Sequence, residues 1–397
     1  MSEQALSGVR VLDLTWYVAG PYCTKLLADY GADVIKVERP GAGDPARRMG
    51  PFLDEQPHPE KSGLFLYLNN NKKSITLNLR SMAGKKLFKE LAREANILVE
   101  SFSPGVMSRL GLDYETLEGL NRGLVMTSIS SFGQTGPYRD YKAAHIVEWA
   151  MAGWRFTDGL RGTKPVQPGG WLTHYIAGLY AAVGTMGALH LRDETGTGQH
   201  LDISEMEACL LVPPYHVTWY AYSGQRHQSQ GAAYLGILPC KDGYVGVNCF
   251  TQPHWEALWS FVGMPEVLQD PRFKTRYGAI YGGHIGEAIA MLVPWLKEHT
   301  KEEIFHSGQD WRIPTGLVPT TKEMLEIPHL QGRGFFVEVD HPEIGRVTQP
   351  GAPFKMIATP WQVARAAPLL GEHNPEVYSS LGYSREDLSK LREAGVI

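Results

Sequence analysis

Residues 9–38, VRVLDLTWYVAGPYCTKLLADYGADVIKVE, contain two strand patterns on either side of one helix pattern. VRVLDLT (9–15) and DVIKVE (33–38) are short apolar runs of the kind typical of buried strands. AGPYCTKLLADYGA (19–32) between them predicts a helix with Pro21 in its first turn, where a missing N–H costs nothing. A strand, a helix and a second strand in this order predict a parallel βαβ unit.

The same alternation continues along the N-terminal half. We predict strands in KSITLNL (73–79), NILVESF (96–102) and GLVMTSISSF (123–132), with a helix that opens at Ser81 in SMAGKKLFKELAREA. The turn TGTGQ leads into a further strand, HLDIS. We therefore predict an α/β fold with a Rossmann-like, doubly wound parallel sheet in a large domain.

The alternation of strand and helix patterns ends near Tyr222, and a smaller α+β domain is expected to follow. CKDGYVGV predicts a hairpin around Asp242 and Gly243, and two helix patterns follow in PHWEALWSFVG and EAIAMLVPWLKEH. A second hairpin is predicted in 334–351, and Ser384 is a candidate N-cap for the last helix. We therefore expect a large Rossmann-like domain over 1–221, a small domain over 222–333, and a return to the large domain over 334–397.

Composition excludes several classes of protein. The chain has 397 residues and a formal net charge of −4, without the basic excess that a nucleic-acid binder needs. Four cysteines without a C-x-x-C pair, and an N-terminus without a cationic start before an apolar run, predict a reduced cytoplasmic protein. The most apolar helix pattern, which follows His174, is interrupted by glycines and predicts a core helix and no membrane span.

The turn ERPGAGDPARR (38–48) combines glycines with Arg39, Arg47 and Arg48. Backbone N–H groups and cations in such a turn can bind phosphates. The alternative is an ordinary basic surface loop, because the turn does not fit a dinucleotide-binding fingerprint.

ESFSPGVMSRLGL (100–112) places Phe102 and Arg109 after a predicted strand, where open α/β sheets bind ligands. Packing of Phe102 and solvation of Arg109 is the alternative explanation. The chain has no Walker loop, G-x-S-x-G elbow or H-E-x-x-H pair. Its 14 histidines show no metal-ligand spacing, so no metal site is predicted.

Seven segments in a fixed order carry a resemblance to a known family. The chain resembles the family III CoA-transferases, which include formyl-CoA transferase and enzymes of the CaiB/BaiF type. The resemblance covers nearly the whole chain and lies in LDLTWYVAGPYCTKLLADYGADVIKVERPGAGDPAR, NNNKKSITLNL, GLDYETL, SSFGQTGPY, AGLYAAVGTMGALHLRDETGTGQHLDIS, DGYVGV and DPRF.

The resemblance implies an enzyme that exchanges coenzyme A between carboxylic acids, with acyl-CoA and a carboxylic acid as substrates and no permanently bound cofactor. It implies an interlocked dimer of two chains. By similarity, the CoA phosphates would meet Arg39 and Arg109 with help from Lys73 and Lys142, and the adenine and pantetheine path would follow Val18, Ala19 and Phe102. Formyl-CoA transferases have a glutamine at the position of Val18, so this chain departs from that pattern.

The second departure lies at the residue that carries the chemistry. In the family, an aspartate just before the glycine of the segment that here reads HYIAG attacks the thioester to give an acyl-aspartyl anhydride. Alignment on Gly178 places His174 at that position. The loss of the carboxylate removes the family's reaction at this residue.

Three roles for His174 remain open. Its imidazole could act as the nucleophile, or as the general base of a related acyl-CoA isomerase or racemase. We favour a third, in which this chain is a subunit of a heteromer whose homologous partner keeps the aspartate. The two-subunit succinyl-CoA:benzylsuccinate CoA-transferase is similar, which implies aromatic or dicarboxylic acids as substrates. Asp140, Glu148 and Asp158 are candidate replacement carboxylates, against the simpler expectation of solvated surface acids.

Overall fold

The computed structural model describes residues 4–153, 168–212, 215–224 and 235–397. These residues form two compact units, and each is described by itself. The larger unit contains the N-terminal part of the chain, the residues from 168 to 224, and Gly334–Ile397. The smaller unit contains the described residues from 235 to Arg333.

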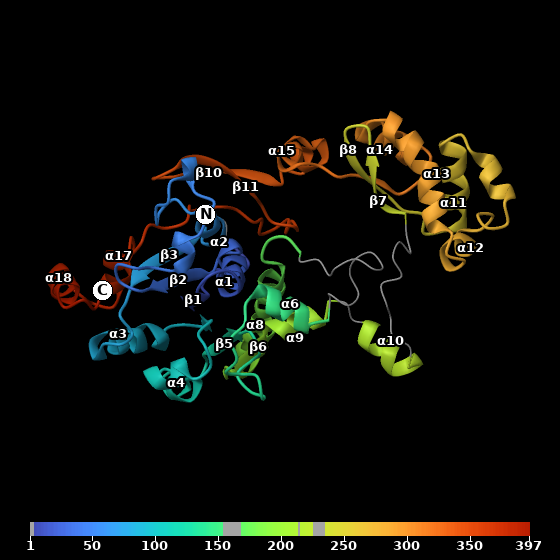
Figure 1. Ribbon diagram of the computed structural model, residues 1–397. Helices are drawn as coiled ribbons and strands as arrows, with labels where there is room; N and C mark the ends of the chain where they lie inside the picture. The colour runs from blue at the N-terminus through green and yellow to red at the C-terminus, as the bar shows by residue number, and fades with distance from the viewer. Residues whose placement is uncertain (1–3, 154–167, 213–214, 225–234) are drawn as a thin grey trace. The chain divides into compact units, whose positions relative to one another are not determined.

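A six-stranded sheet organises the larger unit (Figure 1). The strand order is β3-β2-β1-β4-β5-β6, and every neighbouring pair is parallel. This order reverses direction beside β1, as in doubly wound folds. The predicted α/β architecture is confirmed. The strands are β1 (Arg10–Leu14), β2 (Asp33–Glu38), β3 (Lys72–Thr76), β4 (Ile97–Glu100), β5 (Val125–Ser130) and β6 (His200–Ser204).

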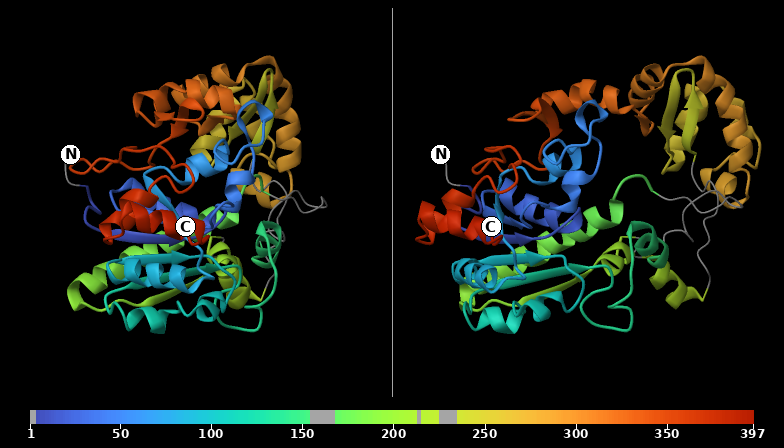
Figure 2. Two further views of the ribbon diagram at one scale, coloured as in Figure 1. Left: turned by 90° about the vertical axis from the view of Figure 1, so that its left-hand side faces the viewer. Right: turned by 60° about the vertical axis from the view of Figure 1, so that its left-hand side comes forward.

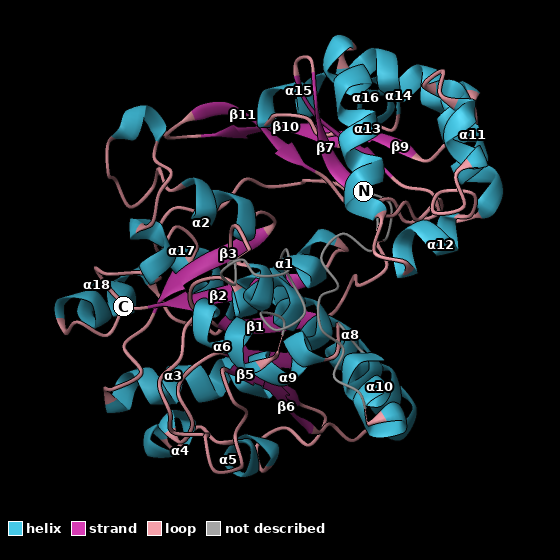
Figure 3. Cartoon of the chain, turned by 45° about the vertical axis from the view of Figure 1, so that its right-hand side comes forward, coloured by secondary structure: helices cyan, strands magenta, loops and turns pink. Residues whose placement is uncertain are grey.

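Helices cover both faces of this sheet (Figure 3). One apolar cluster packs α3, α4, α5, α17 and α18 against one face, and another packs α1, α8 and α9 against the other. The helices of this unit are α1 (Ala19–Asp29), α2 (Gly63–Leu68), α3 (Met82–Arg93), α4 (Val106–Leu110), α5 (Tyr114–Glu118), α6 (His145–Met151), α8 (Leu172–Thr195), α9 (Glu205–Leu210), α10 (Tyr215–Ser223), α17 (Asn374–Ser380) and α18 (Arg385–Glu393).

The C-terminal residues return to the edge of the sheet. Helices α17 and α18, red in Figure 2, lie beside the N-terminal strands. Thr76 N donates to Asn374 Oδ1 over 2.8 Å, and the Tyr378 hydroxyl donates to the Thr76 carbonyl over 2.8 Å. The hairpin of β10 (Phe336–His341) and β11 (Gly345–Pro350) precedes them, and Ser384 caps α18. The predicted hairpin and N-cap are confirmed.

The smaller unit combines an antiparallel sheet with helices. Its strands pair in the order β7-β8-β9, and the hairpin predicted at Asp242 and Gly243 joins the first two. Trp255 and Trp259 are buried in its core. Its elements are β7 (Gly236–Cys240), β8 (Gly243–Val247), β9 (Thr315–Leu317), α11 (Gln252–Phe261), α12 (Arg276–Tyr281), α13 (Ile285–Glu298), α14 (Lys301–Asp310), α15 (Thr321–Glu326) and α16 (Pro328–Gly332).

Two general expectations can be compared with this structure. The four cysteines are free and buried. Within the part of the chain that the structure describes, no helix combines the length and the apolar character needed to cross a bilayer.

Candidate active site

A cavity of about 400 Å³ lies just beyond the carboxyl ends of β1, β4 and β5. Open parallel sheets bind ligands at this edge. All of its lining belongs to the larger unit. The lining comprises residues 16–19, 101–104, 129–131 and 139–143 together with Arg109, Glu148, His174 and Glu205.

The turn after β1 forms one wall, and buried charges hold it. Tyr17 has a left-handed backbone (φ 65°), which is uncommon for a bulky residue and recurs at functional sites. Tyr17 N donates to Asp44 Oδ1 over 3.1 Å. The other oxygen of Asp44 lies 2.9 Å from Lys36 Nζ, and both side chains are wholly buried. These contacts fix Val18 and Ala19, which follow at the start of α1.

The predicted CoA-binding residues mostly gather in this cavity. Val18, Ala19, Phe102, Arg109 and Lys142 line it. The ring of Phe102 meets Trp16 edge-on at 5.5 Å, so Phe102 both packs and contributes to the wall. Arg39 does not line the cavity, but its guanidinium lies 5.3 Å from the centre of the Trp16 ring, on a side chain that does.

Lys73 lies elsewhere. It is the second residue of β3, and its Nζ pairs with Asp33 at 2.8 Å and with Glu376 at 3.0 Å. The amino end of a parallel strand is opposite the edge where the cavity lies. The structure therefore does not bring Lys73 together with Arg109.

Arg47 of the glycine-rich turn differs from both expectations stated for the turn, whereas Arg39 and Arg48 are exposed. Arg47 is buried, and its Nε lies 2.8 Å from Glu38 Oε2 while its Nη2 lies 2.8 Å from Glu38 Oε1. This bidentate pair fixes the turn to the end of β2. Arg47 is thus a structural cation inside the fold, and it is neither a solvated surface charge nor free to bind phosphate.

His174 lies in the first turn of α8 and contacts two carboxylates. Its Nδ1 atom is 3.0 Å from Glu205 Oε1 and 4.0 Å from Glu148 Oε2. One turn further along, Gly178 lets α8 approach α1, because a Cβ at Gly178 would lie 2.5 Å from the Ala19 carbonyl oxygen. This close packing positions His174 beside the turn that carries Val18.

Glu148 is wholly buried in α6, so the expectation of a solvated surface acid is wrong for it. Its Oε2 atom accepts a hydrogen bond from the Thr173 hydroxyl over 3.2 Å, and that hydroxyl lies 2.6 Å from His145 Nδ1. Asp140 is exposed and lies 3.5 Å from Arg139 Nε. Asp158 lies outside the described residues.

The pKa values of the two buried glutamates, Glu148 and Glu205, shift in opposite directions. Burial, together with the charge of Glu205, raises the pKa of Glu148 to about 7. Burial also disfavours the ionised form of Glu205, but the hydrogen bond from His174 outweighs it and lowers the pKa of Glu205. For His174, burial is outweighed by the hydrogen bond to Glu205, which raises its pKa. The contact therefore favours the protonated form of His174 and the ionised form of Glu205, while Glu148 holds its proton to a higher pH than an ordinary glutamate.

The same three groups have the chemistry of a metal site. One ligand atom from each of Glu148, His174 and Glu205 lies within 4.8 Å of the others. Carboxylate and imidazole ligands suit a divalent transition metal. In the structure, however, the His174–Glu205 pair already satisfies its charges by a direct hydrogen bond. Sequence spacing did not indicate this group, because its members come from α6, α8 and α9.

Glu205 was not a predicted site residue. It follows β6 directly, and the rule that ligands bind at the carboxyl ends of parallel strands would have indicated it. The strand HLDIS was predicted, but its end was given no function. Glu205 Oε1 is nevertheless the nearest carboxylate oxygen to His174 among the described residues.

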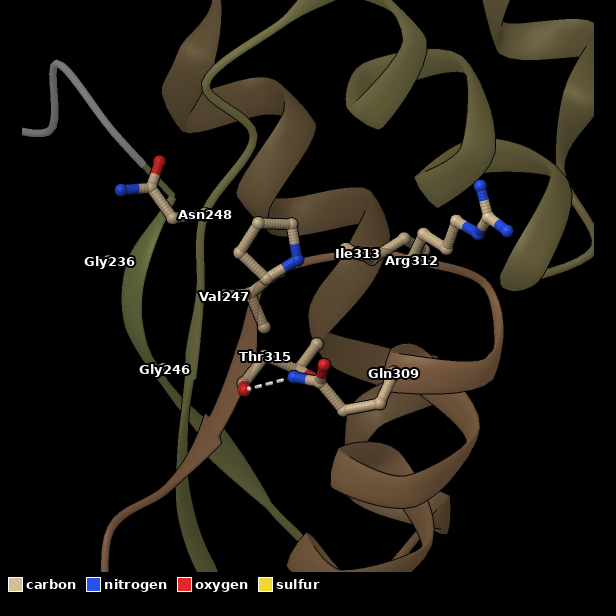
Figure 4. Close-up of a pocket in the computed structure, with 9 residues that line it drawn as sticks. Gly236, Gly246, Val247, Asn248, Gln309, Arg312, Ile313 and Thr315 are labelled. Carbon is tan, nitrogen blue, oxygen red and sulfur yellow. Dashed lines mark hydrogen bonds between the residues drawn. The ribbon is translucent and has the colours of Figure 1, made fainter.

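A larger pocket of about 700 Å³ lies in the smaller unit (Figure 4). Its wall includes Asn248, Gln309, Arg312 and Thr315, and Gln309 Nε2 donates to the Thr315 carbonyl over 3.0 Å. The Arg312 guanidinium and the Asn248 amide point away from each other. Because its polar groups do not converge and none is a predicted site residue, we place the chemistry in the pocket of the larger unit.

The chain is similar to known proteins over nearly its whole length. The sequence model of CoA-transferase family III matches residues 6–374. The chain is 35% identical to succinyl-CoA–D-citramalate CoA-transferase of Chloroflexus aurantiacus, covering 99% of this chain and 98% of that one. It is 31% identical to the alpha subunit of succinyl-CoA–L-malate CoA-transferase of the same organism, covering 99% and 92%. A crystal structure of a CaiB/BaiF family protein from Brucella suis superposes with a TM-score of 0.86 at 28% identity, covering 96% and 100%.

Proposed function

The chain belongs to CoA-transferase family III, and we propose that it moves CoA from an acyl-CoA to a carboxylic acid in the pocket that contains His174. Dicarboxylic acids are the proposed substrate class, since the relatives are named for succinyl-CoA, citramalate and malate. The substrates are acyl-CoA and the free acid, and CoA is not a resident cofactor.

The observation that supports this function best is the convergence of cations and acids in one pocket. Arg109 and Lys142 supply positive charge for a polyphosphate, and Phe102 and Val18 supply apolar wall. His174 and Glu205 lie in the same lining. The phosphate end and the thioester end of a bound acyl-CoA would thus meet separate surfaces within one cavity.

A direct test uses the purified chain with succinyl-CoA and a panel of dicarboxylic acids. Formation of a new acyl-CoA by mass spectrometry supports the function. Titration calorimetry with CoA is the matched binding measurement. Absence of CoA binding and of transfer, both for this chain and for its assemblies with a related chain, would contradict the proposal.

A second arrangement, partner dependence, is favoured by a stripe of exposed apolar residues on α8. Leu172, Leu179, Tyr180, Val183 and Leu191 are each at least 40% exposed and fall on one side of the helix. We call them the α8 stripe. Exposed apolar faces of this kind mark protein interfaces. One relative is an alpha subunit, so the proposed partner is a homologous chain, in an interlocked dimer.

In that arrangement the partner carries the aspartate and this chain's own site is silent. His174→Asp would restore the family's carboxylate, and His174→Asn is the matched control without one. If the site has lost only its nucleophile, His174→Asp transfers CoA without a partner and His174→Asn does not. Equal activity of wild type and both variants without a partner would contradict partner dependence.

A third candidate, proton transfer on the acyl chain, is favoured by the His174–Glu205 contact at 3.0 Å. A histidine oriented by a carboxylate is a common general base. Such an enzyme would exchange the α-proton of an acyl-CoA with solvent. Incubation in D₂O followed by mass spectrometry distinguishes it, because CoA transfer between acids leaves the α-carbon undeuterated.

A further inference from the structure

The carboxylates of the pocket differ in how well they could react. The described lining contains three, Asp140, Glu148 and Glu205. Asp140 is exposed, so water solvates it. Glu148 has no exposed surface, and its Oε2 accepts from Thr173. Glu205 is 7% exposed, and its Oε1 atom lies 3.0 Å from His174 Nδ1, which is closer than the cation contact of Asp140 at 3.5 Å or of Glu148 at 4.0 Å.

Glu205 also lies close to the position of the family's carboxylate. His174 stands where the resemblance places the family's carboxylate, and Glu205 Oε1 lies 3.0 Å from its Nδ1. The carboxylate therefore lies one hydrogen bond away from the substituted residue. This bond engages Oε1, and the side chains of Ser131 and Glu148 also hydrogen-bond to the Glu205 carboxylate, so the carboxylate is held in place from several sides.

We infer that Glu205 is the catalytic nucleophile of this chain and that His174 is its positioning residue. The inference rests on the proposed function, because CoA transfer between acids requires an enzyme group that can be acylated and released. Carboxylates form such covalent intermediates. The lowered pKa of Glu205 is consistent with this role, since the ionised form is the one that attacks.

The reaction balances without an added proton or redox partner. Glu205 adds to the thioester carbonyl carbon, and the C–S bond breaks with its electron pair on sulfur, giving an acyl-glutamyl anhydride and CoA thiolate. The acceptor carboxylate adds to the glutamyl carbonyl and the donor acid leaves as its carboxylate. The thiolate then attacks the acceptor carbonyl, which forms the new thioester and returns Glu205 to its carboxylate form. His174 Nδ1 lies 3.0 Å from Glu205 Oε1, so its protonated form would stabilise negative charge that develops at this carboxylate.

The test is to trap the intermediate on the full-length wild-type chain. Succinyl-CoA is added with hydroxylamine, which converts an activated carboxylate to a hydroxamate, and the Glu205 peptide is examined by mass spectrometry. We expect a hydroxamate at Glu205 that requires succinyl-CoA. A hydroxamate at Glu148 or Asp140 instead would overturn the inference while leaving the proposed function intact.

Variants give an independent measurement. Glu205→Gln keeps the size of the side chain, and it should lower the rate of transfer on the order of 10³-fold or more with CoA affinity retained. Glu207→Gln is the control, because Glu207 is an exposed acid on the same helix. His174→Gln should lower kcat and change the pH profile, a readout that loss of packing alone would not give.

The outcomes separate the two proposals. Transfer by Glu205→Gln at the wild-type rate, or transfer only with an aspartate-bearing partner, overturns the role of Glu205. A chain that binds no CoA and transfers none in any assembly overturns the proposed function itself. If Glu205→Gln does not fold, the trapping experiment on the wild type still decides.

Discussion

Gly178 and Ala19 are in close backbone contact, since a Cβ on Gly178 would lie 2.5 Å from the Ala19 carbonyl oxygen. The contact joins α8 to α1 one turn from His174. A methyl group at this position must therefore push the helices apart, and it moves the two walls of the pocket relative to each other.

We expect Gly178→Ala to lower the free energy of unfolding by about 1–3 kcal/mol, as overpacking of a core does. It should also weaken CoA binding. Gly286→Ala is the control, because Gly286 is a helical glycine with nothing near its Cβ position. Urea denaturation measures the free energy of unfolding of both variants. Equal values for Gly178→Ala and Gly286→Ala would show that α8 can shift without cost.

Arg109→Ala and Lys73→Ala should behave differently toward CoA. Arg109 lines the pocket, and loss of one charge-assisted contact should raise the Kd by about 5- to 100-fold. Lys73 pairs with Asp33 and Glu376 and does not line the pocket, so its removal should leave the Kd unchanged. Titration calorimetry compares them. A Kd raised equally by both changes would place the CoA phosphates away from the pocket.

Glu148→Gln should remove a pH dependence of stability. Burial raises the pKa of Glu148 from 4.5 to about 7, so the folded chain holds a proton that the unfolded chain releases. This proton contributes stability below the unfolded pKa, and the contribution is lost as the pH rises through the folded value. We therefore expect the wild type to lose stability relative to Glu148→Gln between about pH 4.5 and 7.

Denaturation at several pH values tests this expectation, with Glu207→Gln as the exposed control. The Glu207→Gln curve should run parallel to the wild type across the range. Parallel curves for Glu148→Gln as well would mean that Glu148 is ionised in the folded chain at acidic pH.

Lys36→Met should destabilise the larger unit strongly. Lys36 Nζ lies 2.9 Å from Asp44 Oδ2 and donates to the Thr15 carbonyl over 2.9 Å, all without solvent contact. Removal of one partner of a buried pair leaves an uncompensated charge, with a loss of about 3–5 kcal/mol. Lys86→Met, on the exposed face of α3, should change the free energy of unfolding by less than about 0.5 kcal/mol.

Val183→Asp should disrupt association of the chain. Val183 is the most exposed residue of the α8 stripe at 63%, and a buried charge at an interface is unfavourable. Met82→Asp is the control, because Met82 is exposed on α3, which covers the other face of the sheet. Light scattering should show a smaller species only for Val183→Asp. An unchanged mass would exclude the stripe as the interface.

The helices and strands of the fold follow from local patterns in the sequence. The strand and helix patterns of residues 9–38, the hairpin at Asp242 and Gly243, and the Ser384 cap all lie as predicted. Each depends on interactions between residues a few positions apart, such as side-chain periodicity, turn conformation and capping. These local interactions can be read directly from a sequence.

The chemistry of the site, in contrast, depends on contacts between residues far apart in the sequence. Glu205 and His174 are 31 residues apart and meet because β6 ends beside the start of α8. The same folding buries Glu148, pairs Arg47 with Glu38, and places Lys73 at the amino end of its strand. Which side chains face one another across a sheet edge depends on strand order and helix packing. Burial then sets the charge of each acid, since the dielectric environment of a group is created by distant residues.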